Sequence, residues 1–327
     1  MANATISDDN SHGFRMVALD LDGTLLQSNH QLADEQADYL RTLYKSGFRI
    51  CIATGRAAPS VYNIVNKLAL PEPTPVVCSN GARGFLLSYD NTCGAKEKKH
   101  QEELFYTPLP REAVLKTIKL AKELGYFVQY YLGDGIYANP TKQIHHQMVK
   151  EYERLTDSPV QVVDNFDQFI GSDDSNKLPS KMLVRCEKEE FATCHPSFTE
   201  LLCPTPVDGN CKQATTDTLG HIVAAFNTDL DWFLEILHPN VNKGRGLRNM
   251  CEKLDIPIKD VIAIGDGTND IEFLQMSGLG IAMNNAHESL KSVASYTMEW
   301  TNDEHGVMKT LENLRIKGKI YCRNENI

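Results

Sequence analysis

The stretch that most constrains the fold is VALDLDGTLL, Val17 to Leu26. Its apolar start predicts a buried strand, and Asp20 and Asp22 follow two positions apart, before Gly23 and Thr24. Side chains two apart on an extended segment share a face, so we expect both acids together at the carboxyl end of a core strand. Open parallel sheets bind their ligands at that edge. Two carboxylates there require a divalent cation, a shared proton or both.

Length and charge narrow the class of protein. The chain has 327 residues, enough for about two domains with a substantial core. Its apolar runs are strand-sized, shorter than the ~20 residues of a membrane span, so we expect no membrane insertion. The net charge of -10 argues against general nucleic-acid binding, and an anionic substrate needs local Lys, Arg or metal. Residues 1–13 are polar and predict a disordered lead-in, with a cytoplasmic location as the default.

Strands and helices alternate through the first quarter of the chain. The expected order is strand 17–26, helix 34–46, strand 48–56, helix 60–68 and strand 75–82. The second strand ends in Thr54, Gly55 and Arg56, and the third in Ser79, Asn80 and Gly81. This alternation indicates an α/β fold with a doubly wound parallel sheet, a Rossmann-like core.

The pattern changes between residues 84 and 239. A helix followed by two strands occurs twice there, beginning with a helix at 110–124 and a hairpin at 127–139. We expect an α+β domain, with an antiparallel sheet and helices on one face. The polar stretches within it are expected to be loops or insertions, at 91–100, 171–179 and 204–219.

The parallel pattern resumes after Pro239. NKGRGL opens a helix at 242–254, and VIAIGDGTND is an apolar strand whose turn carries Asp266 and Asp270. Residues 14–83 and 240–327 are therefore expected to form one core, and 84–239 an insertion into it.

The strand ends support one kind of chemistry. If the strands are neighbours, their polar residues meet in one cleft: Asp20, Asp22, Thr54, Lys243, Asp266 and Asp270. Carboxylate oxygens suit Mg²⁺, which bridges carboxylate and phosphate. A lysine and a hydroxyl can balance the remaining phosphate oxygens. One acid can then attack phosphorus, and the other can move protons.

These motifs resemble those of a known family. DLDGT, a Thr at the end of the second strand, NKGRGL and GDGTND are similar, in this order, to the four motifs of the haloacid dehalogenase superfamily. The insertion after the third strand resembles that of its Cof-type phosphatase branch. The likeness covers the chain from Phe14 to about Leu314.

The resemblance implies a role for each site residue. Asp20 would be the nucleophile that becomes an aspartyl phosphate, and Asp22 the general acid and base. Phosphate or substrate would be bound by Thr54, Gly55, Arg56, Lys243 and Asn269, with Asn80 and Gly81 at the cleft edge. Mg²⁺ would be held by Asp20, the backbone carbonyl of Asp22 and Asp266, with Asp270 beside the metal or orienting Lys243. The insertion would be a cap that closes over the site and selects the leaving group.

Three functions fit this reading. The leading one is a Mg²⁺-dependent phosphatase acting on a small phosphorylated metabolite, a sugar or polyol phosphate. The second is a sugar phosphomutase with the same nucleophile, which would return the phosphoryl group to sugar instead of water. The third is a non-catalytic regulatory protein that has kept the fold, which the intact catalytic positions argue against.

Overall fold

The computed structural model describes residues 13–88, 101–156, 158–171, 174–203, 218–227 and 231–321. The chain divides into two compact units. The core unit comprises residues 1–56, 61–105 and 242–327, and the inserted unit comprises 57–60 and 106–241. The expected loop at 91–100 lies outside the described residues, as do residues 204–217 of the expected loop at 204–219 and residues 172–173 of the expected loop at 171–179.

The core unit is built on one eight-stranded sheet, in the order β14-β13-β12-β1-β2-β3-β4-β5. The strands are β1 (Met16–Leu19), β2 (Arg49–Ala53), β3 (Thr74–Cys78), β4 (Arg83–Leu87), β5 (Gln101–Tyr106), β12 (Val261–Gly265), β13 (Leu279–Ala282) and β14 (Tyr296–Thr297). The strands from β14 to β3 pair in parallel. Strand β4 runs antiparallel to β3. The predicted α/β class with a parallel core sheet is confirmed.

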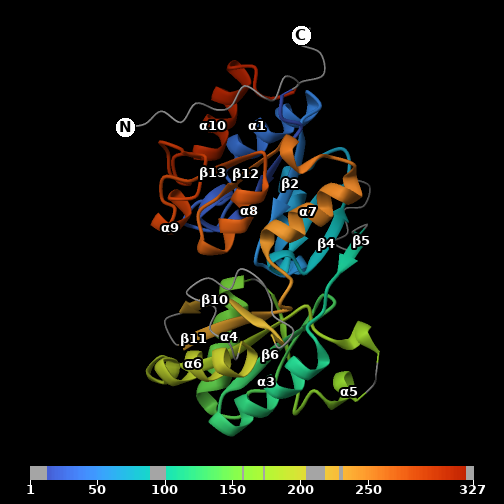
Figure 1. The fold of residues 1–327 in the computed structure, drawn as a ribbon, viewed down its shortest axis with the longest axis vertical. Coiled ribbons are helices and arrows are strands. Elements are labelled where there is room, and N and C mark those ends of the chain that lie inside the picture. Colours follow the sequence, from blue (N-terminus) through green and yellow to red (C-terminus); the bar gives the residue numbers. More distant parts are fainter. Residues whose placement is uncertain are drawn as a thin grey trace. The chain divides into compact units, whose positions relative to one another are not determined.

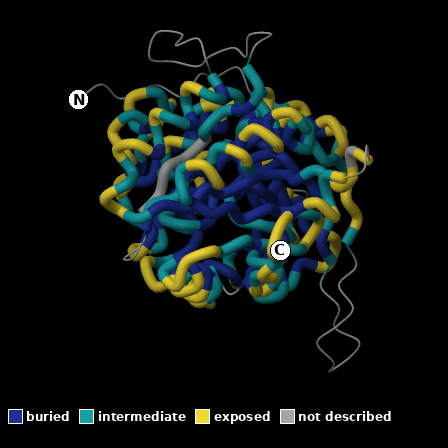
Figure 2. The backbone as a smooth tube through the Cα atoms, turned by 90° about the horizontal axis from the view of Figure 1, so that it is seen from below, coloured by how far each residue is buried: buried dark blue, intermediate teal, exposed yellow. Residues whose placement is uncertain are grey.

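Helices accompany the parallel strands (Figure 1). They are α1 (Asp34–Lys45), α2 (Tyr62–Leu68), α7 (Lys243–Leu254), α8 (Ile271–Met276), α9 (Glu288–Lys291) and α10 (Gly306–Ile316). Helix α1 packs with α2 and α10, and α7 packs with α8. Residues of β1, β3 and β12 are buried throughout, as expected for strands covered on both faces; Figure 2 shows the buried interior in dark blue.

The order of the strands fixes where a ligand binds. From β1 the chain moves to β2 and β3 on one side, and later adds β12 and β13 on the other. Leu19 of β1 is aligned with Ile52 of β2 and with Ile264 of β12. The direction of winding therefore reverses at β1, and open α/β sheets bind ligands beyond the carboxyl ends of the strands at such a point.

The boundary of the insertion differs from the expected one. Strand β4 and residues 101–105 of β5 lie in the core unit, where they extend the sheet beyond β3. The chain turns back directly after β3, so β4 pairs antiparallel to it, Val77 opposite Gly84. An antiparallel edge strand needs no crossover helix, and the alternation used to delimit the core does not detect it.

The inserted unit has a six-stranded sheet in the order β10-β11-β9-β6-β7-β8. Its strands are β6 (Phe127–Leu132), β7 (Gly135–Ala138), β8 (Val160–Val162), β9 (Lys181–Glu187), β10 (His221–Asn227) and β11 (Asp231–Leu237). The pairs are antiparallel except β7 and β8, which run parallel. Its helices are α3 (Arg111–Leu124), α4 (Gln143–Thr156), α5 (Asp167–Ile170) and α6 (Phe191–Leu202).

Helices pack on both faces of this second sheet, and the expectation of one covered face is wrong. Val114 of α3 and Phe198 of α6 share an apolar cluster with Val184 of β9. Met148 of α4 packs instead on Phe127, which shows the other face of the sheet. The parallel pairing of β7 and β8 requires a crossover, and α4 supplies it across that second face.

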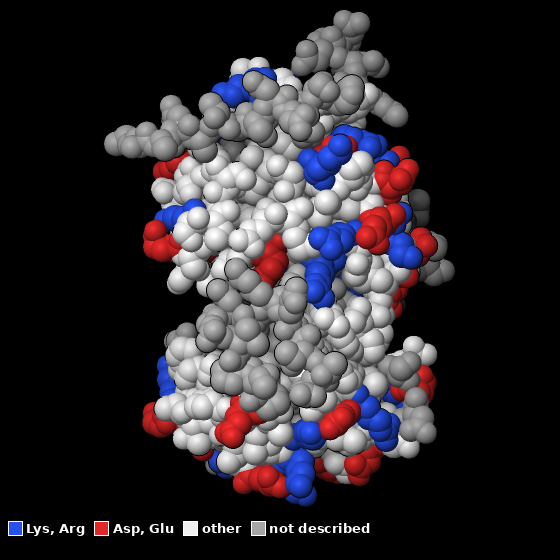
Figure 3. All heavy atoms as spheres, in the orientation of Figure 1, with Lys and Arg blue, Asp and Glu red and all other residues white. Residues whose placement is uncertain are grey.

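The surface carries charged side chains of both signs. Acidic and basic side chains are interspersed on the face of each unit that Figure 3 shows. Among the described residues, no helix is both long and apolar enough to cross a bilayer.

The face of the second sheet under α4 contains a buried ion pair. Arg185 of β9 and Asp231 of β11 are both fully buried, and the Arg185 Nε donates to Asp231 Oδ2. Arg185 also donates to Gln129 Oε1 at 2.7 Å and to the Met148 carbonyl at 3.3 Å. Its guanidinium therefore links three elements of the inserted unit.

We predict that Asp231→Ala lowers the free energy of unfolding of the inserted unit by about 3–5 kcal/mol, because it leaves a buried guanidinium without its carboxylate. The double variant Arg185→Met/Asp231→Leu removes both charges and should cost much less. The chain has one tryptophan in each unit, so Trp300→Phe leaves Trp232 as a fluorescent reporter of this unit during urea unfolding.

Glu123→Ala is the control, since Glu123 is exposed and lies 3.9 Å from Lys119 in a surface pair. It should change stability by less than about 0.5 kcal/mol. A cost for Asp231→Ala no larger than that of Glu123→Ala would contradict the importance of the buried pair.

Candidate active site

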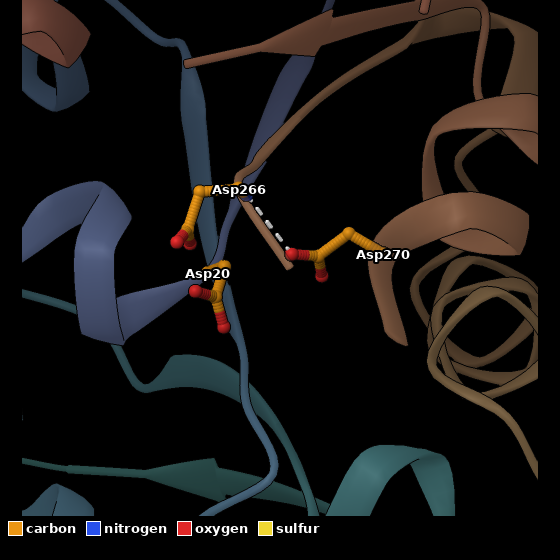
Figure 4. A group of neighbouring side chains, drawn as sticks. All are labelled: Asp20, Asp266 and Asp270. Atoms are coloured by element: carbon orange, nitrogen blue, oxygen red, sulfur yellow. Dashed lines mark hydrogen bonds between the residues drawn. The ribbon is translucent and has the colours of Figure 1, made fainter. Parts of the chain in front are cut away.

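Two acids lie at the ends of the two central strands. Strand β1 ends at Leu19, and the next residue, Asp20, donates its backbone N–H to the Ile264 carbonyl of β12 at 3.0 Å. Asp266 follows β12 directly after Gly265. Because β1 and β12 are hydrogen-bonded neighbours, the two carboxylates lie side by side at the switch point of the sheet (Figure 4).

A buried lysine links Asp20 to a third acid. The side chain of Lys243 is fully buried, and its Nζ donates to Asp20 Oδ1 at 2.7 Å and to Asp270 Oδ1 at 2.5 Å. Burial alone would lower the pKa of Lys243, but the charges of Asp20 and Asp270 outweigh it and raise that pKa. The ammonium group therefore stays charged at the centre of the site.

Glycines allow Lys243 to reach this position. It is the first residue of α7, after Asn242, whose side chain accepts the Arg245 N–H and caps the helix. A Cβ on Gly246 would lie 2.4 Å from the Cα of Gly81, and a Cβ on Gly81 would lie 2.2 Å from the Asn242 carbonyl oxygen. Glycine weakens a helix by about 1 kcal/mol relative to alanine. Here it permits the close approach that brings Lys243 between two acids.

Asp270 uses both carboxylate oxygens within the protein. Oδ1 accepts from Lys243, and Oδ2 accepts the backbone N–H groups of Asp266 at 3.1 Å and Gly267 at 3.0 Å. The dashed line in Figure 4 marks the bond to Asp266. Of its two expected positions, beside a metal or orienting Lys243, the hydrogen bonds favour the second.

The donor set suits a hard cation. Asp20, Asp266 and Asp270 have carboxylate oxygens within 4.8 Å of one another. Burial, followed by the charge of Asp270, raises the pKa of Asp266 to about 6, although Thr24 donates a hydrogen bond to it. Burial also raises the pKa of Asp20, with Lys243 acting against it. Burying carboxylates this close together costs free energy, and a bound divalent cation would offset that cost, so this cluster fits a hard divalent cation.

Asp22 and Asp20 have different hydrogen-bond partners. Its carboxylate accepts two hydrogen bonds from Arg56, at 2.7 Å from Nε and 2.5 Å from a terminal nitrogen, and lies 3.1 Å from His30 Nδ1. Burial would raise the pKa of Asp22, but the hydrogen bonds and charge of Arg56, and then those of His30, lower it. The strand stops before Asp20, so the alternation of side chains along a strand does not apply to these two acids.

The turn after Asp20 is irregular and depends on a glycine. Residues Leu21–Leu25 form a short irregular turn in which Asp22 is extended and Gly23 has φ 73°. A Cβ on Gly23 would lie 2.2 Å from Asp266 Oδ2. Thr24 then donates its hydroxyl to Asp266 Oδ1 at 2.8 Å. Gly23 is therefore required for both its conformation and its closeness to Asp266.

The second and third strand ends contribute the neighbouring polar groups. Thr54, which follows β2, is buried, and its hydroxyl accepts the Arg56 N–H at 3.1 Å. Asn80, which follows β3, is fully buried and accepts a hydrogen bond from Asn269 Nδ2 at 2.9 Å. Asn80 also donates its backbone N–H to the Thr54 carbonyl at 3.1 Å, and a Cβ on Gly55 would lie 3.1 Å from Asn80 Nδ2.

Sequence reasoning missed His30 and Thr24 as neighbours of the acids. His30 lies in an exposed link between the first turn and α1, with φ 61°. No periodic pattern marks such a residue. The Thr24 contact was foreseeable, because the residue belongs to the same DLDGT stretch and a hydroxyl beside two acids is a natural donor.

Comparisons with known proteins find relatives that match most of the chain. A family model described as haloacid dehalogenase-like hydrolase matches residues 17–311. Phosphatase YwpJ of Bacillus subtilis is 26% identical over 322 residues, which cover 92% of this chain and 99% of that protein. The 5-amino-6-(5-phospho-D-ribitylamino)uracil phosphatase YitU of the same organism is 26% identical over 302 residues, covering 91% and 96%. A solved haloacid dehalogenase-like hydrolase from Bacteroides thetaiotaomicron shares the fold, with TM-score 0.71 and 23% identity over 92% of this chain and 99% of its own.

We predict that Gly23→Ala destabilises the core unit by at least about 1 kcal/mol more than Gly318→Ala. Both glycines have left-handed backbones, with φ 73° and 65°, so both substitutions carry a conformational cost of roughly 1–2 kcal/mol. Only at Gly23 must a neighbour also move, since nothing lies within 4 Å of a Cβ on Gly318. Urea unfolding followed by Trp300 fluorescence, in a Trp232→Phe background, measures the difference. Equal losses would show that the approach to Asp266 carries no cost.

Proposed function

The chain belongs to the haloacid dehalogenase-like hydrolase family, and we propose that it is a Mg²⁺-dependent phosphatase that hydrolyses small phosphate esters through an aspartyl-phosphate intermediate. One observation carries the proposal. Asp20 and Asp266 lie side by side at the switch point of the sheet, with the buried ammonium of Lys243 2.7 Å from Asp20. Negative and positive groups so close together suit a phosphoryl group that must be both attacked and neutralised.

The cation would be held by Asp20, Asp266 and the backbone carbonyl of Asp22. It would supply positive charge to the phosphate oxygens and so reduce their repulsion of the attacking carboxylate. Asp270 would orient Lys243 rather than bind the cation, because its two oxygens already accept three hydrogen bonds.

Asp20 is the proposed nucleophile. Lys243 holds Oδ1, which fixes the carboxylate in one orientation. An Asp20 oxygen would attack phosphorus as the bond from phosphorus to the ester oxygen breaks, giving an acyl phosphate on Asp20 and a free alcohol. Water would then attack the same phosphorus, which releases inorganic phosphate and restores the carboxylate.

Asp22 is the proposed proton carrier. It would give a proton to the departing ester oxygen and take one from the attacking water, so it returns to its starting state after each turnover. Asp22 lies in the turn that follows Asp20, and its carboxylate is held there by Arg56 and His30. Both partners favour the ionised carboxylate, the form needed to accept a proton from water.

The phosphoryl oxygens would meet Lys243, Thr54, Gly55 and Asn269. Asn269 is oriented by the buried amide of Asn80, and Thr54 and Gly55 follow the neighbouring strand β2. Arg56 would serve at the edge of this set, where its guanidinium is already engaged by Asp22.

We infer that the substrates are sugar or polyol phosphates. Relative YitU is named for a phosphate ester on a ribitylamino group. The chain carries a net charge of -10, so a small phosphate ester would be captured by the local charge of the site rather than by the whole surface. The family motifs all lie in the core unit, and we assign selection of the leaving group to the inserted unit.

We predict that the protein releases inorganic phosphate from some members of a panel of sugar and polyol phosphates, and that chelation with EDTA stops this until Mg²⁺ is restored. Asp20→Asn should lower kcat by a factor of about 10³ or more. Glu252→Gln, at an exposed position on α7, is the control and should match the parent. Exchange between sugar phosphate isomers without phosphate release would favour a phosphomutase instead. Full activity of Asp20→Asn would exclude Asp20 as the nucleophile.

The proton-transfer role of Asp22 gives a different prediction. An alkyl phosphate must have its departing oxygen protonated, whereas an aryl phosphate leaves as a stable phenolate. Asp22→Asn should therefore lower kcat by about 10²- to 10⁴-fold for alkyl esters. The rate of phosphoenzyme formation from aryl esters should fall by a smaller factor. Rapid quenching in acid, followed by measurement of protein-bound phosphate, separates the two steps. Equal defects on both ester types would argue against a proton donated by Asp22.

A further inference from the structure

Three backbone carbonyls of the turn after Asp20 are held by side-chain amides. Asn285 Nδ2 donates to the Gly23 carbonyl at 2.8 Å, Gln36 Nε2 to the Leu25 carbonyl at 3.1 Å, and Asn302 Nδ2 to the Leu26 carbonyl at 2.9 Å. The turn is irregular, so helix hydrogen bonds do not satisfy these groups. The three amides come from α1 and from two loops far away in the sequence.

The two asparagines are joined to each other. The backbone N–H of Asn302 donates to Asn285 Oδ1 at 3.1 Å, so Asn285 uses its amide nitrogen on the turn and its amide oxygen on the second loop. Asn302 is buried, with 6% of its surface exposed. A shift of the turn would therefore break bonds to both loops.

The loop that carries Asn285 also reaches the second acid. Two residues later, the His287 N–H donates to the Asp266 carbonyl at 2.9 Å. At its other end, the Met283 N–H donates to the Gly265 carbonyl at 3.0 Å. The segment from Met283 to His287 thus binds the end of the strand that precedes Asp266, Asp266 itself and, through Asn285, Gly23.

The distance between the turn and Asp266 matters for a bound cation. The Gly23 carbonyl belongs to the peptide unit next to the one that contains the Asp22 carbonyl, so the bond from Asn285 restricts movement of the turn that carries both carbonyls. The turn passes so close to Asp266 that a Cβ on Gly23 would lie 2.2 Å from Oδ2. Small displacements would therefore change the spacing between two of the proposed oxygen ligands.

We propose that Asn285 and Asn302 are positioning residues for the cation site, which fix the Asp22 carbonyl and the Asp266 carboxylate at the spacing that one divalent ion requires. This rests on the proposed function, because it takes those two groups as ligands. Groups that orient ligands without touching the metal commonly change its affinity by about 10- to 100-fold. Asn285 touches neither the proposed ligands' oxygens nor Lys243, so an effect on cation affinity would act through the turn.

The test is calorimetric titration of the phosphate-free protein with MgCl₂. Asn285→Ala should weaken Mg²⁺ binding by about 10-fold or more. Asn284→Ala is the matched control, because it removes the same side chain from the adjacent exposed position. Asn285→Gln, which restores a carboxamide, should recover part of the affinity. At saturating Mg²⁺ the KM for a phosphate ester should stay within about two-fold of the parent, since no substrate contact is removed.

A second variant keeps the test decisive. Asn302→Asp preserves the buried volume but cannot donate to the Leu26 carbonyl, and it too should weaken Mg²⁺ binding. Circular dichroism and the unfolding midpoint without Mg²⁺ show whether each variant is folded. If folded Asn285→Ala and Asn302→Asp both bind Mg²⁺ as the parent does, the positioning role is wrong. If the parent itself neither binds Mg²⁺ nor hydrolyses any ester, the proposed function fails instead.

Discussion

The buried ammonium of Lys243 is the interaction on which the rest of the site depends. A fully buried lysine is expensive unless carboxylates and hydrogen bonds compensate it, and here Asp20 and Asp270 do so at 2.7 and 2.5 Å. Each member of this trio is placed by a different element: the end of β1, the first residue of α7 and the turn after β12. The close approach at Gly246 and Gly81 is what allows α7 to deliver the lysine. The packing of α7 against Gly81 therefore also places the ammonium group that balances the charges of Asp20 and Asp270.

Much of the fold and of the candidate site could be predicted from the sequence, because local patterns of apolar residues mark where the strands end. Asp20, Thr54 and Asp266 each follow an apolar run of strand length, and parallel strands bring such ends to one edge. The helix that begins at Lys243 was equally visible, since its apolar residues repeat at helical spacing. Local pattern and tertiary placement agree at these positions, so a single sequence indicates where they lie in the sheet.

The features that the sequence did not predict depend on contacts between residues far apart in the chain. The hydrogen-bond partners of Asp22 are Arg56, a residue 34 positions away, and His30, which lies in an exposed link. The pairing of β4 with β3 depends on an immediate reversal of the chain, and the position of α4 depends on whether β7 and β8 run parallel. None of these is a periodic property of a segment. Each is decided by long-range pairing, which a single sequence does not display.

Cation binding and folding stability are linked through the same acids. An acid whose pKa is raised in the folded state binds its proton more tightly there than in the unfolded chain. Its contribution to folding stability is favourable at low pH and is lost as pH rises. For Asp266 the loss occurs as the pH rises from the ordinary pKa of 3.8 to the folded-state pKa of about 6. Near neutral pH the ionised carboxylate of Asp266 therefore opposes folding when no cation is bound. A cation that binds only the ionised, folded site reverses that penalty, by an amount that grows with its concentration. The closeness of these buried acids, which makes the ionised site costly to fold, thus also favours a bound cation.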